Sequence, residues 1–547
     1  MLENNGLMII FAIISIIIWN VSFFYRCRFM LHMMQLEGYK NTNYIKWISE
    51  FRYKVFYSKI NILMIIAIIL AVVNLVAVQE QFSLLYIILW SVLIILSTDF
   101  KKENVKKDLV YTKRAQRLLA SIYIVNILIL VVSISIYSAL TTDFFKYYAI
   151  LLIIGAALYY LVPYTLYIAN FIVKPVENAI NKHYFDMAHN KVRSFKNLNI
   201  VGITGSYGKT STKFITAKIL EEKYNVLKTP ESYNTPMGVS KVINNTLDDG
   251  YDAFVVEMGA RNIGDIKEMA ELAGPKIGVI TSIGPTHLET FINIDNIMKT
   301  KYELIEALPP DGIAIFNYDN QYVKKLADKT FKEKILYGTE NIEQLDIYAT
   351  NIEVSKIGST FILNDKNGNS IKCETKLLGE HNIGNLLAGA AIGVALGLKF
   401  EEIAEGIKKV EPVPHRLQLI NPGTGVIIID DAFNSNPVSS KAALDVISQF
   451  KEGRKIIVTP GMIELGQEEE EANRQFGRYI SEVCDYVILV GKNRTKPIYE
   501  GIFEKEFNKD SVFVVNSLNE ATAVLQKIVR PKDVVLFEND LPDTYNE

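Results

Sequence analysis

A glycine-rich stretch at residues 202–211 carries the residue types that bind nucleotide phosphates. It follows a short apolar run and precedes a segment, 211–224, with helical spacing. A strand, a glycine-rich turn and a helix start direct backbone N–H groups and the positive end of the helix dipole at an anion. Lys209 would reach the β- and γ-phosphates, and the Thr210 hydroxyl would bind Mg²⁺. Ile203 stands where the general phosphate-loop pattern has glycine, so an ordinary glycine-rich turn is the alternative.

Several polar residues near predicted strand ends or on predicted helices could act beside this loop. Glu257 closes the apolar run FVVE and offers a carboxylate to Mg²⁺, which prefers oxygen ligands. His287 follows the run GVITSIG, and Lys301 lies in a segment with helical spacing. Asn382 and Asn385 are three residues apart and would share a helix face. Each residue alone fits a structural or surface role better, so only their grouping indicates a site.

The elements that must position these residues begin at residue 197. From there, short β-rich apolar runs alternate with helical patterns, which predicts parallel sheets flanked by helices. Residues 347–378 predict a small antiparallel insertion, and the break at 410–414 predicts a boundary between two α/β units. Open α/β sheets bind ligands at the carboxyl ends of their strands. The predicted strands are 199–204, 253–257, 277–283, 312–317, 425–430, 455–459, 486–490, 512–515 and 533–537.

The N-terminal third predicts a membrane region of five transmembrane helices. Its long apolar runs are 7–24, 60–79, 82–98, 118–140 and 147–173. The first run lacks the basic leader and cleavage site of a signal peptide. Lys and Arg gather between the first and second runs and between the third and fourth. The positive-inside rule therefore predicts a multi-pass plasma-membrane protein with its N-terminus outside and its catalytic domains in the cytoplasm. The basic loops could also bind acidic lipid head groups.

Length and composition set the domain plan. A chain of 547 residues suggests three or four domains: transmembrane helices 1–173, a connector 174–196, and two α/β domains, 197–413 and 414–547. A net charge of −2 gives no reason to expect nucleic-acid binding. The cysteines, at 27, 373 and 484, have no metal-ligand spacing and suit a reducing compartment.

Ten motifs in chain order resemble the ATP-dependent Mur ligases over about residues 197–547. The similarity is greatest to the subgroup that adds D-alanyl-D-alanine to a UDP-muramoyl tripeptide (MurF). The resemblance implies a P-loop central domain and a Rossmann-like C-terminal domain, both α/β, after the α-helical transmembrane region. The motifs are TGSYGKTS (204–211), SYNTPMG (232–238), VEMGA (256–260), SIGPTHLETF (282–291), KTKYELIEAL (299–308), NYDN (317–320), GEHNIGNLLAGAA (379–391), PHRL (414–417), DDAFNSNP (430–437) and MIELG (462–466).

The resemblance also implies a reaction of peptidoglycan synthesis. ATP would convert a substrate carboxylate into an acyl phosphate, and an incoming amine would attack it to form an amide bond. Lys209 would stabilise the transferred phosphoryl group. Thr210 and Glu257 would hold one Mg²⁺, and His287 a second. Lys301 matches a lysine that many family members carry as a carbamate, which would place a carboxylate beside the metal.

Nucleotide contacts follow from the same resemblance. Asn382, Asn385 and Asp319 resemble contacts to adenine and ribose. Arg416 and Asp431 resemble residues that close the C-terminal domain over the nucleotide and exclude water. The implied ATP-binding set is Thr204, Gly205, Ser206, Tyr207, Gly208, Lys209, Thr210, Ser211, Asp319, Asn382, Asn385, Arg416 and Asp431.

Two departures from the family affect the expected substrates. The family carries a soluble N-terminal domain that grips a UDP-sugar, whereas this chain has apolar helices there, so the muramoyl-peptide acceptor would be UDP-linked or lipid-linked. Gly461 stands where the D-alanyl-D-alanine-adding enzymes usually have Asp, so the amine donor would be D-Ala-D-Ala or an amino acid. The alternatives are a membrane P-loop ATPase of transport and a non-catalytic envelope scaffold. Intact Lys209, Glu257, His287 and Lys301 argue against the scaffold.

Overall fold

The computed structural model describes residues 2–76, 80–100, 108–138, 144–231, 233–433 and 435–541. Ser232 and Asn434 of the predicted motifs and the basic segment 101–107 lie outside these ranges. The chain divides into an N-terminal unit that ends at Ile180 and a second unit over Asn181–Leu541.

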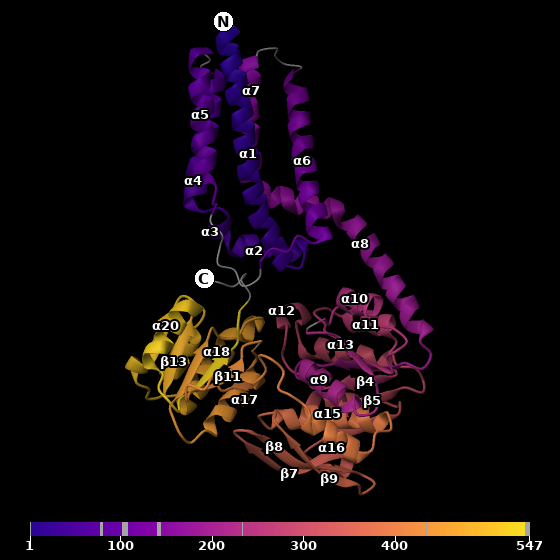
Figure 1. Ribbon diagram of the computed structural model, residues 1–547. Coiled ribbons are helices and arrows are strands. Elements are labelled where there is room, and N and C mark those ends of the chain that lie inside the picture. The colour runs from indigo at the N-terminus through magenta and orange to yellow at the C-terminus, as the bar shows by residue number, and fades with distance from the viewer. Residues whose placement is uncertain are drawn as a thin grey trace. The chain divides into compact units, whose positions relative to one another are not determined.

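The N-terminal unit is helical throughout its described elements (Figure 1). Helix α4 packs against α5 and α7, and α1 packs against α5. Apolar side chains such as Ile65 and Ile69 are exposed on the outer faces, which suits a lipid environment. The helices are α1 (Leu2–Leu36), α2 (Asn41–Glu50), α3 (Arg52–Val55), α4 (Ser58–Val76), α5 (Glu80–Ser97), α6 (Lys113–Ser138), α7 (Phe144–Tyr160) and α8 (Val162–Ser194).

Three of these helices are long and apolar enough to cross a membrane: Ile9–Leu36, Ser58–Val76 and Lys113–Tyr137. A fourth span results if α7 and α8 count as one, although they meet at a bend of 75°. The bend lies beside Pro163 in the first turn of α8, a position where proline is tolerated. The remaining predicted span falls on the shorter apolar stretch Leu84–Ser97 and stays a prediction. The predicted connector, residues 174–196, continues helix α8 and is therefore helical as far as Ser194.

The first α/β domain contains a nine-stranded sheet in the order β2-β3-β1-β4-β5-β6-β7-β8-β9. The strands from β2 to β7 are parallel, and β7, β8 and β9 pair antiparallel, which confirms the predicted insertion. The chain leaves β1 for β2 and β3 on one side and returns to β4 on the other, so the carboxyl end of β1 lies at a topological switch point. The strands are β1 (Asn199–Thr204), β2 (Val226–Lys228), β3 (Ala253–Glu257), β4 (Ile277–Ile280), β5 (Ile313–Asn317), β6 (Lys334–Gly338), β7 (Ile347–Ser355), β8 (Gly358–Asp365) and β9 (Ser370–Thr375).

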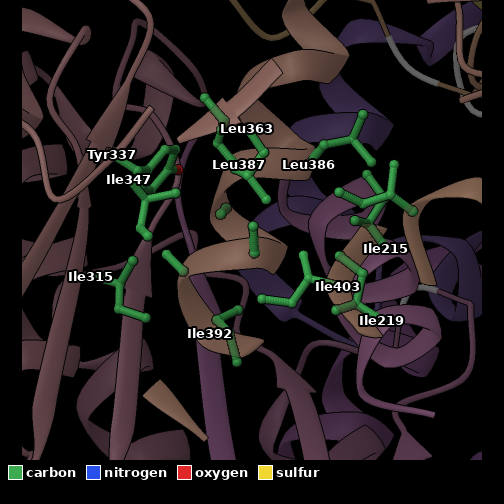
Figure 2. Packing of buried hydrophobic residues seen from close by; sticks show 14 of the residues in the cluster. Ile215, Ile219, Ile315, Tyr337, Ile347, Leu363, Leu386, Leu387, Ile392 and Ile403 are labelled. Atoms are coloured by element: carbon green, nitrogen blue, oxygen red, sulfur yellow. The ribbon is translucent and has the colours of Figure 1, made fainter. Parts of the chain in front are cut away.

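Helices cover both faces of this sheet. Figure 2 shows Ile215 and Ile219 of α9, Leu387 of α15 and Ile403 of α16 packed into one core with strand residues such as Ile315. On the opposite face, α10, α11 and α13 bury their apolar sides against β1, β3 and β4. The helices are α9 (Lys209–Leu220), α10 (Pro236–Asn245), α11 (Asp265–Ala273), α12 (Leu288–Phe291), α13 (Ile294–Glu306), α14 (Gln321–Asp328), α15 (His381–Ala395) and α16 (Phe400–Lys408).

The second α/β domain contains a six-stranded sheet in the order β10-β11-β15-β12-β13-β14. Only β10 runs antiparallel to its neighbour. The predicted α/β class and the nine strands proposed from the sequence are therefore confirmed, with ends shifted by a few residues. The elements are β10 (Gln418–Ile420), β11 (Ile427–Asp431), α17 (Pro437–Ser448), β12 (Lys455–Thr459), α18 (Glu469–Val483), β13 (Tyr486–Val490), α19 (Lys496–Ile502), β14 (Val512–Val515), α20 (Leu518–Ile528) and β15 (Val534–Glu538).

Candidate active site

The predicted phosphate loop joins β1 to α9, as the sequence pattern indicated. Gly205 has a φ of +154° and Gly208 a φ of +80°. A Cβ on Gly205 would lie 2.1 Å from the Thr281 hydroxyl oxygen, and one on Gly208 would lie 2.5 Å from Asn385 Oδ1. Both positions therefore need glycine, for the backbone conformation and for the close approach. The loop ends where α9 begins, and a helix N-terminus is where backbone N–H groups can meet an anion.

Lys209 folds back over this loop. Its Nζ donates to the carbonyl oxygens of Gly205 (2.7 Å) and Ser206 (3.1 Å). Burial lowers the pKa of Lys209 to about 8, while the Glu257 carboxylate opposes that shift. The cation is thus held where a phosphate on the loop would meet it.

Glu257, at the end of β3, is the centre of a buried polar network. Its Oε1 accepts hydrogen bonds from the Thr210 hydroxyl (3.1 Å) and from Asn234 Nδ2 (3.0 Å). Its Oε2 accepts one from Lys213 Nζ at 3.0 Å. The side chains of Glu257 and Lys213 are 1% and 0% exposed. The donors lie at separate places in the chain: Thr210 and Lys213 on α9, and Asn234 just before α10. The fold therefore sets the orientation of the carboxylate.

The residues at this point fit a magnesium ion that arrives with phosphate. Thr210 and Glu257 bring two hard oxygen donors together, which is the ligand type Mg²⁺ prefers. Among the described residues, no group of three or more His, Cys, Asp or Glu could hold a metal ion by itself. Phosphate oxygens and water would complete the coordination, as in other sites where Mg²⁺ binds through one carboxylate and a nucleotide.

Asn382 and Asn385 lie on one face of α15, as predicted, and bond to each other at 3.0 Å. Asn385 Oδ1 also accepts from the Thr212 hydroxyl of α9 at 3.2 Å, which brings α15 to the loop. Asp319 lies after β5, and its carboxylate accepts backbone N–H groups from Thr339 and Glu340 at 2.7 and 3.0 Å. These contacts are structural, so the roles of all three in binding adenine or ribose stay predictions.

His287 makes a contact between the two α/β domains. It precedes α12 with a φ of +51°, and its Nδ1 lies 2.7 Å from Glu464 Oε2. Arg261 Nη2 lies 3.3 Å from the other oxygen of Glu464. The hydrogen bond from His287 and the charge of Arg261 hold the pKa of Glu464 below its ordinary value, despite burial. Because Nδ1 is engaged, a metal would bind His287 through Nε2.

Lys301, on α13, is 3% exposed. Its Nζ lies 5.8 Å from the centre of the Phe291 ring. Burial, and secondarily the charge of Lys209, lower the pKa of Lys301 to about 7. A lysine that is substantially neutral near pH 7 is the form that reacts with carbon dioxide, so the environment suits the implied carbamate.

The C-terminal domain contributes Arg416 and Asp431. The Arg416 guanidinium lies 4.2 Å from the centre of the Phe433 ring, and its Nε is buried without a hydrogen-bond partner in the described part of the chain. Burial lowers the pKa of Arg416, while the charges of Asp431 and Glu257 oppose that shift. Burial raises the pKa of Asp431 to about 6. Arg416 is thus close enough to Glu257 for the two charges to interact.

Comparison with known families agrees with this geometry. Residues 203–393 match the Mur ligase middle domain, and residues 415–538 match the Mur ligase, glutamate ligase domain. The UDP-N-acetylmuramoyl-tripeptide--D-alanyl-D-alanine ligase of Mycobacterium leprae is 31% identical over 373 residues, which are 62% of this chain and 71% of that protein. The chain belongs to the Mur ligase family. Mur ligases are ATP-dependent, so this chain is an ATP-dependent ligase, and the transport ATPase and scaffold alternatives are disfavoured.

Further relatives point to the MurF subgroup. The Escherichia coli (strain K12) UDP-N-acetylmuramoyl-tripeptide--D-alanyl-D-alanine ligase is 34% identical over 54% of this chain and 64% of its own length. A MurF from Acinetobacter baumannii superposes with a TM-score of 0.60 at 26% identity, covering 67% of this chain and 78% of that one. A MurF from Thermotoga maritima in complex with ADP superposes with a TM-score of 0.59 at 25% identity, covering 66% and 80%. This Mur ligase is therefore MurF-like in its two α/β domains.

Three site residues were not singled out from the sequence. Asn234 lies within the SYNTPMG motif, and Glu464 lies within MIELG, so the motifs contained them without indicating their contacts. Lys213 lies four residues after Lys209 on α9, on the same helix face, a spacing that could have drawn attention to it. All three act through partners distant in sequence, Glu257 and His287, which only the folded chain brings near.

Proposed function

We propose that this Mur ligase is anchored in the plasma membrane and joins D-Ala-D-Ala to the carboxylate of a muramoyl peptide at the cytoplasmic side. The convergence of Lys209, Thr210 and Glu257 at the switch point of the first sheet carries the proposal. The names of the relatives supply the substrate classes, a UDP-muramoyl tripeptide and D-alanyl-D-alanine. The apolar helices of the N-terminal unit support the anchor.

The residues divide the chemistry into two steps. In the first, an oxygen of the substrate carboxylate attacks the γ-phosphorus of ATP, ADP leaves, and an acyl phosphate forms. Lys209 and the loop N–H groups stabilise the charge that gathers on the transferred phosphoryl oxygens. In the second, the amine nitrogen attacks the acyl carbon, phosphate leaves, and the nitrogen loses a proton as the amide forms.

Magnesium belongs to the same proposal. When bound, the ion would neutralise charge on the phosphate oxygens, and Thr210 and Glu257 would hold it. His287 would hold a second ion through Nε2, and Lys301 as a carbamate would add a carboxylate beside it. Arg416 and Asp431 would contact the nucleotide from the C-terminal domain.

The acceptor is the part of the function that the N-terminal unit changes. The two relatives are matched over 71% and 64% of their length, and the family models match residues 203–393 and 415–538, beyond the candidate membrane helices. A membrane-embedded N-terminal unit keeps the catalytic domains within reach of a lipid-linked muramoyl peptide. We therefore propose a lipid-linked acceptor, with the UDP-linked form as the alternative.

Purified full-length protein in detergent tests the proposal. The protein is supplied with ATP, Mg²⁺ and D-Ala-D-Ala, or single amino acids, and with a lipid-linked or a UDP-linked muramoyl tripeptide. Phosphate release and product mass are measured. Lys209→Ala should abolish both, whereas Lys218→Ala, an exposed lysine on the same helix, should not.

The outcomes separate the parts of the proposal. A mass gain with the lipid-linked acceptor supports the whole proposal. A gain with the UDP-linked acceptor alone leaves a MurF reaction and limits the N-terminal unit to anchoring. ATP hydrolysis that depends on Lys209 but forms no amide with any amine or acceptor would refute the proposed substrates.

A further inference from the structure

Lys213 is a buried cation placed against the carboxylate expected to hold magnesium. It lies on α9, its side chain is 0% exposed, and its Nζ donates to Glu257 Oε2 at 3.0 Å. The same Nζ also donates to the backbone carbonyl of Glu231. The side chain of Lys213 therefore reaches from its helix into the network of Glu257 and is held there at both contacts.

The two oxygens of Glu257 have separate partners. Oε1 faces Thr210, at 3.1 Å, on the side where the phosphate loop begins α9, and Oε2 is taken by Lys213. This division fixes the plane of the carboxylate and leaves one oxygen beside the threonine hydroxyl. Asn234 Nδ2 also donates to Oε1, at 3.0 Å.

The Glu257–Lys213 pair carries no net charge, and the charges of Lys209 and Arg416 also act on it. Glu257 contributes one negative charge and Lys213 one positive charge, and the described residues contain no group of three or more His, Cys, Asp or Glu that could hold a metal ion. A free divalent cation gains little at a neutral pair and is repelled by the lysine. A cation bound to a triphosphate belongs to a complex whose net charge is negative. Lys213 therefore does not repel that complex as it repels the free cation.

We propose that Lys213 is a positioning residue that aims Glu257 at the Thr210 hydroxyl and neutralises it, so that the divalent cation is held only together with the nucleotide. The inference concerns the ATP site of the proposed function and needs neither its acceptor nor its amine donor. Binding of metal and nucleotide as one unit would keep the carboxylate from taking up free cations between turnovers.

Direct metal binding tests this role without turnover. Free Mn²⁺ is titrated against full-length protein in detergent by electron paramagnetic resonance, with and without a non-hydrolysable ATP analogue. The variants are Lys213→Met, which removes the charge at similar length, and Lys213→Arg, which keeps it. Lys218→Met is the matched control, because Lys218 lies on the same helix with its side chain 40% exposed.

Wild type, Lys213→Arg and the control should bind Mn²⁺ at this site only when the analogue is present. Lys213→Met should bind Mn²⁺ without the analogue at least about tenfold more tightly than wild type, because the repulsion is gone. The gained binding should disappear in Lys213→Met combined with Glu257→Gln.

Two results would overturn the proposal. One is folded Lys213→Met protein, judged by its melting temperature, that binds free Mn²⁺ no better than wild type. The other is wild-type protein that binds free Mn²⁺ without nucleotide and loses it in Glu257→Gln, a result that requires no Lys213 variant to fold. Neither measurement uses an acceptor, so a failure of the proposed ligation would be seen separately.

Discussion

Glu538 offers a quantitative test of how the C-terminal domain holds a buried carboxyl group. It ends β15, is 0% exposed, and lies in register with Asp431 of β11. Its carboxyl oxygens meet the hydroxyl groups of Ser435 and Thr459. Burial, and secondarily the nearby charge of Asp431, raise the pKa of Glu538 from 4.5 to about 8.

The direction in which folding stability changes with pH follows from the ionisation of Glu538 in the folded and unfolded states. Between about pH 4.5 and pH 8 the unfolded carboxyl is ionised, whereas the folded one keeps its proton. Rising pH therefore favours unfolding across that window, and the loss of folding stability is complete above about pH 8. The difference in pKa corresponds to at most roughly 5 kcal/mol. At about 2–4 °C per kcal/mol, the expected fall in melting temperature is several degrees or more.

Glu538→Gln keeps the shape and hydrogen-bonding capacity of the group but cannot ionise. We expect its melting temperature to be close to wild type at pH 5 and several degrees above wild type at pH 8.5. Thermal unfolding of the full-length protein, followed by a fluorescent dye or calorimetry, measures this. Glu452→Gln is the matched control, since Glu452 is an exposed glutamate whose side chain is 77% accessible.

One outcome would refute this reasoning. If Glu538→Gln and wild type show the same change in melting temperature between pH 5 and pH 8.5, the folded carboxyl is already ionised across the range. Burial at the end of β15 would then be compensated by groups other than Ser435 and Thr459.

Three further predictions concern the active site. Gly208→Ala should weaken ATP-analogue binding by at least about tenfold in calorimetry, because its Cβ would lie 2.5 Å from Asn385 Oδ1 at a φ of +80°; unchanged affinity would mean that the loop readily moves. Protein equilibrated with ¹³C-bicarbonate at pH 7.5 should show a carbamate resonance that Lys301→Met lacks, because burial lowers the pKa of Lys301 to about 7; a resonance that survives the substitution would place the carbamate elsewhere. Glu464→Ala should lower kcat/KM two- to fivefold, because a partly exposed contact to His287 contributes about 0.5–1 kcal/mol; a loss of a hundredfold would give Glu464 a direct catalytic role.

Local sequence determined much of this protein. The spacing of Gly205, Gly208 and Lys209 between an apolar run and a helical pattern predicted a phosphate loop, and the loop is there because its conformation depends on glycines within a few residues. The predicted strands were recognisable for the same reason, since β-rich runs between helical patterns report on residues that are close in the chain. Short strands such as β2, with only three residues, carried too little pattern to be found.

The partners within the site were decided only by the tertiary structure. Asn385 meets Thr212 across 173 residues of sequence, and His287 meets Glu464 across 177. The pKa of Lys301 depends on burial and on the charge of Lys209, which lies on another helix far from Lys301 in the chain. Such contacts follow from the order of strands in a sheet and from the docking of two domains. Many segments share the same local pattern, and the pattern does not say which of them become neighbours. Burial, charge and distances at the site are therefore defined only in the folded chain.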